Sequence, residues 1–204
     1  MKQSLQCQCD NVMELDLPET INLDGEAQWL QAIHDGNFLS YSCERCGTTL
    51  RPEPALTVNF RLFAKPLFVA PEDERIAVIR GKLAVDTSCE IVVGIAEFIE
   101  RVKIVEAELE PKAIEVLKYY LQSKAEESEP ESDLTVYFGT VVDEGLQFRI
   151  SGFASGETGL LTIPRSKYQE IQGNLPALSK KLPFKALFSG QYQSYKKAAF
   201  LDNN

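Results

Sequence analysis

The chain has 204 residues, of which 44% are apolar and 25% are charged, values that are ordinary for a folded globular protein. No apolar stretch approaches the ~20 residues needed to cross a bilayer, and the N-terminal segment lacks the apolar run of a secretory signal. The net charge of −9 disfavours binding to nucleic acid or anionic lipid over the whole surface. We therefore expect a cytoplasmic protein without membrane association, whose five cysteines stay reduced.

The first third of the chain predicts short strands around one short helix. Val12–Leu17 alternates partly between apolar and polar residues, as a half-buried strand does. Asp24–Ile33 has helical spacing of its apolar residues, with Asp24 as the expected N-cap and Gly36 after the helix end. We expect further strands, separated by proline and charged residues, at Phe38–Tyr41, Leu56–Phe63, Pro66–Val69 and Ile76–Ile79.

A pair of helices is expected next. Apolar residues recur at helical spacing over residues 95–105, and Glu97 and Glu100 lie off this stripe. Both carboxylates are therefore expected on a solvated helix face. Pro111 suits the first turn of a second helix, and the short connection predicts that the two helices pack as an antiparallel pair. The buried face of the second helix is expected to contain Ile114, Leu117 and Leu121.

The remainder of the chain predicts β-structure after an acidic break. Residues 125–133 contain five acidic residues, one proline and no large apolar residue, which is typical of a linker or loop. Leu134–Phe138 and Leu146–Ile150 flank the turn signal Asp143–Gly145 and predict a hairpin. We expect a further strand at Gly159–Ile163, followed by a short helix from Pro164 to about Ile171.

These elements predict an α+β fold in three parts. A small antiparallel sheet with a zinc-ribbon-like site of four cysteines and the helix pair would form residues 1–124. The linker would cover residues 125–133, and a β-rich region would cover residues 134–204. This last region is electrostatically distinct, because it carries a net charge of +3 whereas the preceding residues carry −12.

Four of the five cysteines fall in two close pairs, Cys7-Gln8-Cys9 and Cys43-Glu44-Arg45-Cys46. Zinc takes four ligands at tetrahedral corners, and two cysteines separated by two residues on a tight turn can reach one ion. Gly47 can adopt a positive φ after the second pair, which lets backbone amides point at the thiolates. The first pair reaches a shared ion only if the chain bends there, as the following Asp10-Asn11 favours.

The spacing therefore predicts one structural zinc site with the ligands Cys7, Cys9, Cys43 and Cys46. Four protein ligands leave no open coordination position, so no catalytic role is expected for the ion. The alternatives are ordinary buried cysteines, redox-active thiols and an iron site. Cys89 stands alone before an apolar run and is expected to be a small core residue.

The order of these features resembles the CpXC domain proteins of bacteria and archaea. The resemblance rests on the first cysteine pair, Pro18 with Ile21–Asp24, Asp35–Phe38, the second pair with Gly47, and Ile91–Phe98 through Glu115–Lys118. It covers residues 1 to about 124. Two departures stand out: Glu44 replaces the usual proline, and the first pair is one residue shorter. The resemblance implies zinc binding by the four cysteines and implies no activity.

No assembled catalytic or cofactor-binding set is recognised. The single histidine, His34, is expected to be exposed, whereas hydrolytic triads and catalytic zinc sites usually need histidine. We expect a non-enzymatic, zinc-stabilised protein that binds a protein partner, and the sequence predicts no oligomeric state. One alternative is a thiol-redox enzyme using Cys43 and Cys46. The other is a nucleic-acid binder, in which lysines and aromatic residues of segment 180–197 form a patch, although the acidic remainder makes nucleic acid an unfavoured partner.

Overall fold

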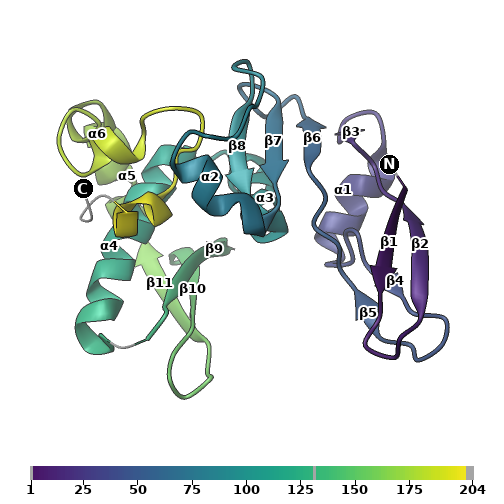
Figure 1. Ribbon diagram of the computed structural model, residues 1–204. Helices are drawn as coiled ribbons and strands as arrows, with labels where there is room; N and C mark the ends of the chain where they lie inside the picture. The colour runs from purple at the N-terminus through teal and green to yellow at the C-terminus, as the bar shows by residue number, and fades with distance from the viewer. Residues whose placement is uncertain (1, 131, 201–204) are drawn as a thin grey trace. The chain divides into compact units, whose positions relative to one another are not determined.

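The computed structural model describes residues 2–130 and 132–200, and the chain forms two compact units (Figure 1). The N-terminal unit extends to Ile95, and the C-terminal unit begins at Ala96. Small antiparallel sheets, several helices and a β-rich C-terminal part confirm the expected α+β class.

The division between the units differs from the expected boundary at residues 125–133. The helices α3 (Gly94–Glu106) and α4 (Pro111–Ser128) contribute to the core of the C-terminal unit, so the chain divides before them. The first four residues of the expected acidic linker, 125–128, are helical, because α4 continues to Ser128. Glu131, which belongs to the expected linker, lies outside the described residues.

The N-terminal unit is built on a four-stranded mixed sheet of order β3-β6-β7-β8. The outer pairs β3–β6 and β7–β8 are parallel, and the central pair β6–β7 is antiparallel. Its strands have the bounds Thr20–Asn22 (β3), Leu56–Asn59 (β6), Leu67–Ala70 (β7) and Glu90–Val93 (β8). The alternating residues Leu56, Val58, Leu67 and Val69 are almost fully buried, which anchors the sheet in the core of this unit.

Two two-stranded hairpins complete the β-structure of the N-terminal unit. Strand β1 (Lys2–Gln6) pairs with β2 (Val12–Asp16), and β4 (Tyr41–Ser42) pairs with β5 (Thr49–Leu50), both in antiparallel fashion. The expected strand over Phe38–Tyr41 thus begins only at Tyr41. Leu39 has a φ of 47°, a left-handed conformation that interrupts an extended chain.

The first helix begins later than its sequence pattern predicts. Helix α1 covers Ala27–His34, and its N-cap residue Glu26 makes no side-chain capping bond. Asp24, the expected N-cap, instead accepts a hydrogen bond from the backbone N–H of Arg61 at 2.7 Å. The helix ends as expected, because Gly36 has a φ of 70°, which favours glycine after a helix.

One expected strand of the N-terminal unit is a helix. The segment Ile76–Ile79 lies in α2 (Arg75–Ile79), which continues directly from the short 3₁₀ helix η1 (Glu72–Glu74). A run of four or five apolar residues fits a buried strand and one helical turn equally well, so periodicity does not distinguish them. Acidic residues fill the turn before α2, where they favour a helix N-terminus.

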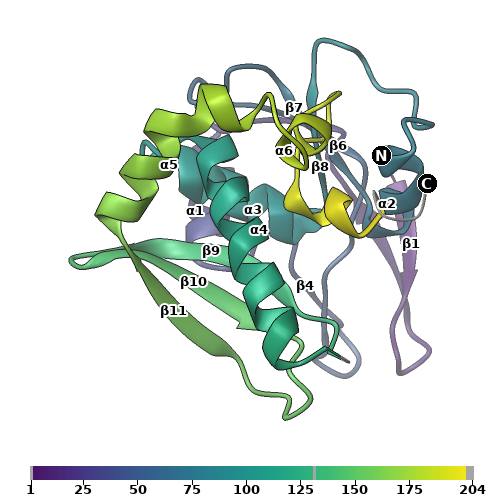
Figure 2. The same cartoon turned by 90° about the vertical axis from the view of Figure 1, so that its left-hand side faces the viewer.

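The C-terminal unit packs helices on one face of a three-stranded antiparallel sheet of order β11-β10-β9 (Figure 2). The expected hairpin is confirmed as β9 (Thr135–Val142) and β10 (Gly145–Ser151), with a register shift at Gln147/Phe148. Strand β11 covers Gly159–Pro164. The remaining elements are α5 (Arg165–Leu178), α6 (Phe184–Leu187) and the 3₁₀ helix η2 (Tyr195–Phe200). The core contains, among others, Ile114, Leu117, Val136, Phe138, Phe148 and Tyr168.

A buried ion cluster of Glu100, Glu115 and Lys118 lies between α3 and α4. The Lys118 Nζ donates to carboxylate oxygens of Glu100 and of Glu115, each at 2.7 Å. The expectation that Glu97 and Glu100 face solvent is wrong, because these side chains are only 6% and 4% exposed. The polar side of α3 packs against strand β9 and the 3₁₀ helix η2. Hydrogen bonds satisfy the carboxylates there.

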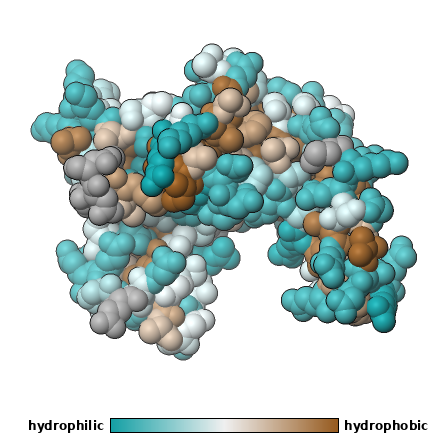
Figure 3. Space-filling model, in the orientation of Figure 1, coloured by the Kyte–Doolittle hydropathy of each residue, from teal (hydrophilic) through white to brown (hydrophobic). Residues whose placement is uncertain are grey.

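The visible surface in Figure 3 is mostly hydrophilic, with hydrophobic residues gathered in a few places. Exposed large apolar side chains in the described residues include Val12, Leu160 and Leu182. Within the described part of the chain, no helix combines the length and apolar character that crossing a membrane requires.

Candidate metal centre

The first two cysteines lie in the turn of the β1–β2 hairpin. Strand β1 ends at Gln6, so Cys7 and Cys9 follow the extended segment instead of alternating along it. The Cys7 N–H donates to the Asn11 carbonyl at 2.8 Å, and the Asp10 N–H donates to the Cys7 carbonyl at 2.9 Å. Asp10 has a φ of 64°, which aspartate tolerates better than most residues. This turn supplies the bend that a Cys-x-Cys pair needs for both sulfurs to point the same way.

The second pair lies in the turn of the β4–β5 hairpin. The Cys43 N–H donates to the Thr48 carbonyl at 2.9 Å, and the Gly47 N–H donates to the Cys43 carbonyl at 2.8 Å. Gly47 has a φ of 74°, as its position after the pair predicts. Two tight turns therefore hold the four cysteines, and each turn is closed by its own backbone hydrogen bonds.

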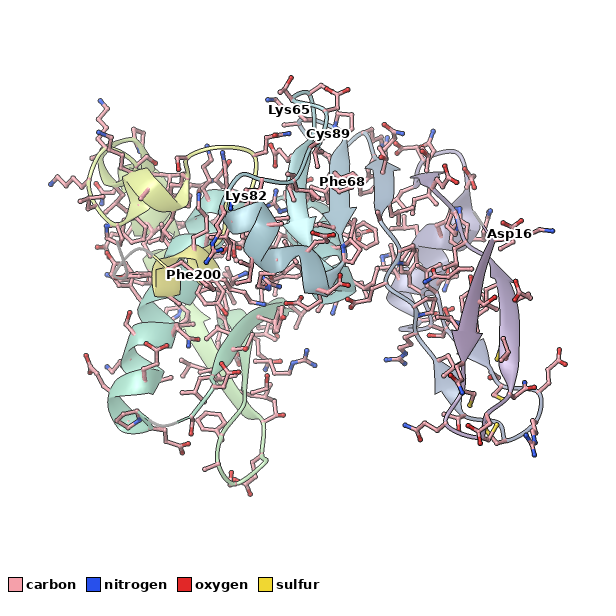
Figure 4. The ribbon with its side chains drawn as sticks, viewed as in Figure 1. Asp16, Lys65, Phe68, Lys82, Cys89 and Phe200 are labelled. Atoms are coloured by element: carbon pink, nitrogen blue, oxygen red, sulfur yellow. The ribbon has the colours of Figure 1, made fainter. Side chains whose placement is uncertain are left out.

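The four cysteines Cys7, Cys9, Cys43 and Cys46 form one cluster, whose sulfur atoms all lie within 4.8 Å of one another. Figure 4 shows sulfur atoms gathered at the ends of the two hairpins. The short distances join the hairpins: Cys7 Sγ lies 3.5 Å from Cys46 Sγ, and Cys9 Sγ lies 3.7 Å from Cys43 Sγ. Residues far apart in sequence thus contribute to a single group.

Three polar neighbours support the cysteines and were not recognised in that role in the sequence: Arg45 and Asn11 connect the two turns, and Thr48 acts within the second turn. The Arg45 guanidinium donates to the Cys9 carbonyl at 2.9 Å, and the Asn11 amide contacts Cys43 Sγ at 3.5 Å. Thr48 pairs its hydroxyl with Cys46 Sγ at 3.2 Å. All three residues lie within two positions of a cysteine, and this proximity is the signal that could have indicated a supporting role.

The cysteine environments differ in exposure and in proton affinity. Cys7 and Cys43 are each 2% exposed, Cys9 is partly buried and Cys46 is exposed. The backbone amide of Cys46, opposed by burial and helped by the amide of Arg45, lowers the pKa of the Cys43 thiol to about 6. The pKa of Cys46 is lowered mainly by its hydrogen bond with the Thr48 side chain. Amides in the second turn therefore stabilise thiolate charge there.

The group of donors fits a metal ion that prefers sulfur. With Zn–S bonds of ~2.3 Å, the edges of a tetrahedron of sulfurs measure ~3.8 Å. The two measured distances between hairpins, 3.5 and 3.7 Å, are close to that edge, and the cysteines are free thiols. Four sulfur donors suit soft or borderline cations and do not suit magnesium or calcium, which prefer oxygen. The four-cysteine cluster could therefore hold a metal ion.

Cys89 and His34 do not belong to this cluster. Cys89 is 7% exposed, as expected for a core residue, and Figure 4 shows it near the start of β8, away from the hairpins. His34 is exposed at the end of α1, also as expected. Neither residue contributes to the group of potential ligands found in the described part of the chain.

Most aromatic rings of segment 180–197, together with Lys196 and Lys197, are used within their own unit, whereas Lys180, Lys181 and Lys185 are exposed. Phe184, Tyr192 and Tyr195 are at most 4% exposed, so their rings are not available for stacking on bases. Lys196 Nζ lies 3.2 Å from a Glu97 carboxylate oxygen and 2.9 Å from the Tyr137 hydroxyl. These contacts leave a smaller exposed basic surface than the sequence pattern indicates.

Comparison with known proteins identifies a family and an uncharacterized relative. The sequence profile of the CpXC protein family matches residues 5–118. An uncharacterized protein of Treponema pallidum (strain Nichols) is 26% identical over 213 aligned positions, which cover 94% of this chain and 96% of that protein. No solved structure matches the chain. The profile match includes both cysteine pairs and more than half of the sequence, and the chain therefore belongs to the CpXC protein family.

Proposed function

We propose that this protein is a non-enzymatic protein stabilised by one structural zinc ion. The observation that carries the proposal is the convergence of four sulfur atoms within 4.8 Å of one another. Cys7, Cys9, Cys43 and Cys46 would hold the ion as thiolates in a zinc-ribbon-like arrangement of two hairpin turns. When bound, zinc would supply coordination bonds and positive charge, with no open position for a substrate.

The short hairpins of the N-terminal unit support a structural role for the cluster. Each hairpin is short, and two-stranded hairpins are marginally stable alone in water. In small zinc domains, metal binding contributes on the order of 10 kcal/mol of folding free energy. A zinc ion shared by the two turns would therefore fix β1–β2 against β4–β5. A reducing compartment such as the cytoplasm, which we also propose, keeps the four thiols available for the metal.

Metal analysis of the full-length, untagged protein tests the proposal. We expect one equivalent of zinc by mass spectrometry in the wild-type protein and none in Cys43→Ala. Cys89→Ala provides a matched control, because it removes a buried cysteine outside the cluster. Zinc at one equivalent in Cys43→Ala, or no metal in freshly purified wild-type protein, would contradict the proposal.

Thiol-redox activity is the second candidate, favoured by the lowered pKa of Cys43. That thiolate is buried, however, whereas an attacking thiol must be accessible, and the exposed member of the pair is Cys46. Thiol titration separates the two candidates. We expect the thiols of the cluster to react slowly in the untreated protein and quickly after chelation. Four fast-reacting thiols before chelation would favour the redox candidate.

We further propose that the biological partner is a protein and not a nucleic acid. The net charge of −9 repels phosphates, and the C-terminal aromatic rings are mostly buried. Titrating the full chain with fluorescent single-stranded and duplex oligonucleotides at low salt tests this point. Binding that weakens steeply with added salt would overturn the assignment.

A further inference from the structure

Strand β11 is the outer strand of the C-terminal sheet, and its outer edge is bare. It pairs with β10 through Gly159–Pro164 and has no strand on its other side in the sheet order β11-β10-β9 (Figure 2). Among the described residues, no recorded hydrogen bond joins the backbone of residues 160–163 to anything outside the sheet. The strand carries no charge, and Leu160 and Leu161 are 67% and 40% exposed. A bare, uncharged, apolar edge is a template for a further strand.

The opposite edge of the same sheet is protected by side chains. The Tyr195 hydroxyl accepts from the Val136 N–H at 2.9 Å and donates to the Val136 carbonyl at 3.1 Å. The Glu100 carboxylate accepts a hydrogen bond from the Phe138 N–H. Val136 and Phe138 belong to β9 (Thr135–Val142), so side chains occupy the first half of this edge. The β11 side is therefore the edge that is open to a further strand along its whole length.

An apolar row on the core-facing side of the sheet ends at the bare edge. Phe148 of β10 lies opposite Phe138 of β9 and opposite Leu161 of β11, so the three side chains share one face. The two phenylalanines are at most 3% exposed, whereas Leu161 at the end of the row is 40% exposed. A residue beyond Leu161 would complete the burial of this row.

We propose that the occupant of this edge is β11 of a second copy of the chain, paired antiparallel about a two-fold axis. Alternate residues of an edge strand turn their N–H and C=O groups outward. In an antiparallel pair of two identical strands, an outward-facing residue of one copy must lie opposite an outward-facing residue of the other. Opposed residues therefore have numbers that differ by an even number. The register centred on Leu161 satisfies this condition and places Leu161 beside Leu161 of the second copy, which extends the apolar row across the dimer.

Charge complementarity supports this register and favours a second copy over an unrelated peptide. In the register centred on Leu161, Leu160 of one copy lies opposite Thr162 of the other. The exposed residue Glu157, just before β11, then lies opposite the exposed residue Arg165, just after β11 of the other copy. The two-fold axis repeats this pairing, so two acidic–basic contacts flank an uncharged strand. Opposite charges thus meet at the seam, the line where the two β11 strands pair, although the chain has a net charge of −9.

Sedimentation equilibrium of the full-length protein tests the proposal through a charge exchange. The wild-type protein should dimerise, and Glu157→Arg or Arg165→Glu should each raise the dissociation constant roughly tenfold or more, because each creates two like-charge contacts per dimer. An equimolar mixture of these two variants should recover wild-type affinity, since both seam contacts then join opposite charges. Glu127→Arg makes the same charge change at an exposed site on α4 and should leave the dimer unchanged.

Leu160→Lys provides a second disruption that does not depend on the charge pairs. It should abolish dimerisation while far-UV circular dichroism stays unchanged, because Leu160 is 67% exposed in the single chain. A wild-type protein that stays monomeric from roughly 1 to 100 µM would overturn the proposal. Dimers that survive Leu160→Lys would place the interface elsewhere, and failure of the mixed variants to recover would reject this register.

Discussion

Replacing Lys118 with methionine should destabilise the C-terminal unit by about 3–5 kcal/mol at neutral pH, the cost of breaking a buried ion pair. The side chains of Lys118, Glu100 and Glu115 are at most 8% exposed, and the ammonium lies 2.7 Å from both carboxylates. Methionine fills similar space with an unbranched chain, so the loss reflects charge more than packing. Two carboxylates would then remain buried without their cation.

Acidification should reduce the difference between Lys118→Met and the wild-type protein. Burial raises the pKa of Glu100, and the charge of Lys118 opposes that rise. Without Lys118, the pKa of Glu100 in the folded variant rises further above its value in the unfolded chain, ~4.3. As the pH falls toward ~4.3, Glu100 of the folded variant takes up a proton while the same residue in the unfolded chain is still ionised. This proton uptake stabilises the folded variant relative to the unfolded chain. In the wild-type protein, the pKa of Lys118 is raised by Glu100 and Glu115 against the effect of burial, so it stays charged throughout this range.

Urea titration with two probes measures the effect in each unit. Far-UV circular dichroism reports both units, whereas fluorescence of the single tryptophan, Trp29, reports the N-terminal unit. With a slope of ~2 kcal/mol/M, the circular dichroism transition of the C-terminal unit should move to lower urea by roughly 2 M, while the fluorescence transition stays in place. Lys103→Met, on the exposed side of α3, should change stability by less than ~0.5 kcal/mol. A loss below ~1 kcal/mol for Lys118→Met, or a loss independent of pH, would refute this reasoning.

Four further predictions follow from individual contacts. Lys197→Met should lower stability by about 1–3 kcal/mol in thermal unfolding, because Nζ donates to the carbonyls of Ala186, Leu187, Ser189 and Tyr192. Gly145→Ala should disrupt the β10–β11 pairing, measured by amide exchange, since a Cβ there would lie 2.0 Å from the Ile163 carbonyl oxygen. Gly173→Ala, in α5 with open space around it, should raise the free energy of unfolding by about 0.5–1 kcal/mol. Chelation should speed amide exchange in both cysteine turns and leave β9–β11 unchanged.

Features that depend on neighbouring residues could be predicted from the sequence. The turn at Asp10, the positive φ of Gly47 and the β9–β10 hairpin each follow from local turn chemistry. Asp24 shows where local reasoning ends. It has the right identity and position for a helix cap, but its carboxylate pairs with Arg61, which lies far along the chain. A tertiary contact replaces the local one there.

The buried carboxylates of α3 could not be predicted, because periodicity describes one helix and not the layers around it. Glu97 and Glu100 occupy the polar side of the stripe, and only the folded unit covers that side as well. Their cationic partners, Lys196 and Lys118, lie in other elements. The four-cysteine cluster was easier to predict, since both halves are short motifs whose residue type itself indicates a shared partner.

The position of helix α4 determines where the chain can be truncated. It starts within the stretch matched by the family profile, which stops at residue 118, yet Ile114 and Leu117 are buried by the sheet that follows. A fragment that ends at residue 118 would expose the apolar face of α4 to solvent and would lack the last turns of this helix. The safer excision point lies ahead of Ala96. A natural homologue that contains only the matched residues would need another element to bury the apolar face of that helix.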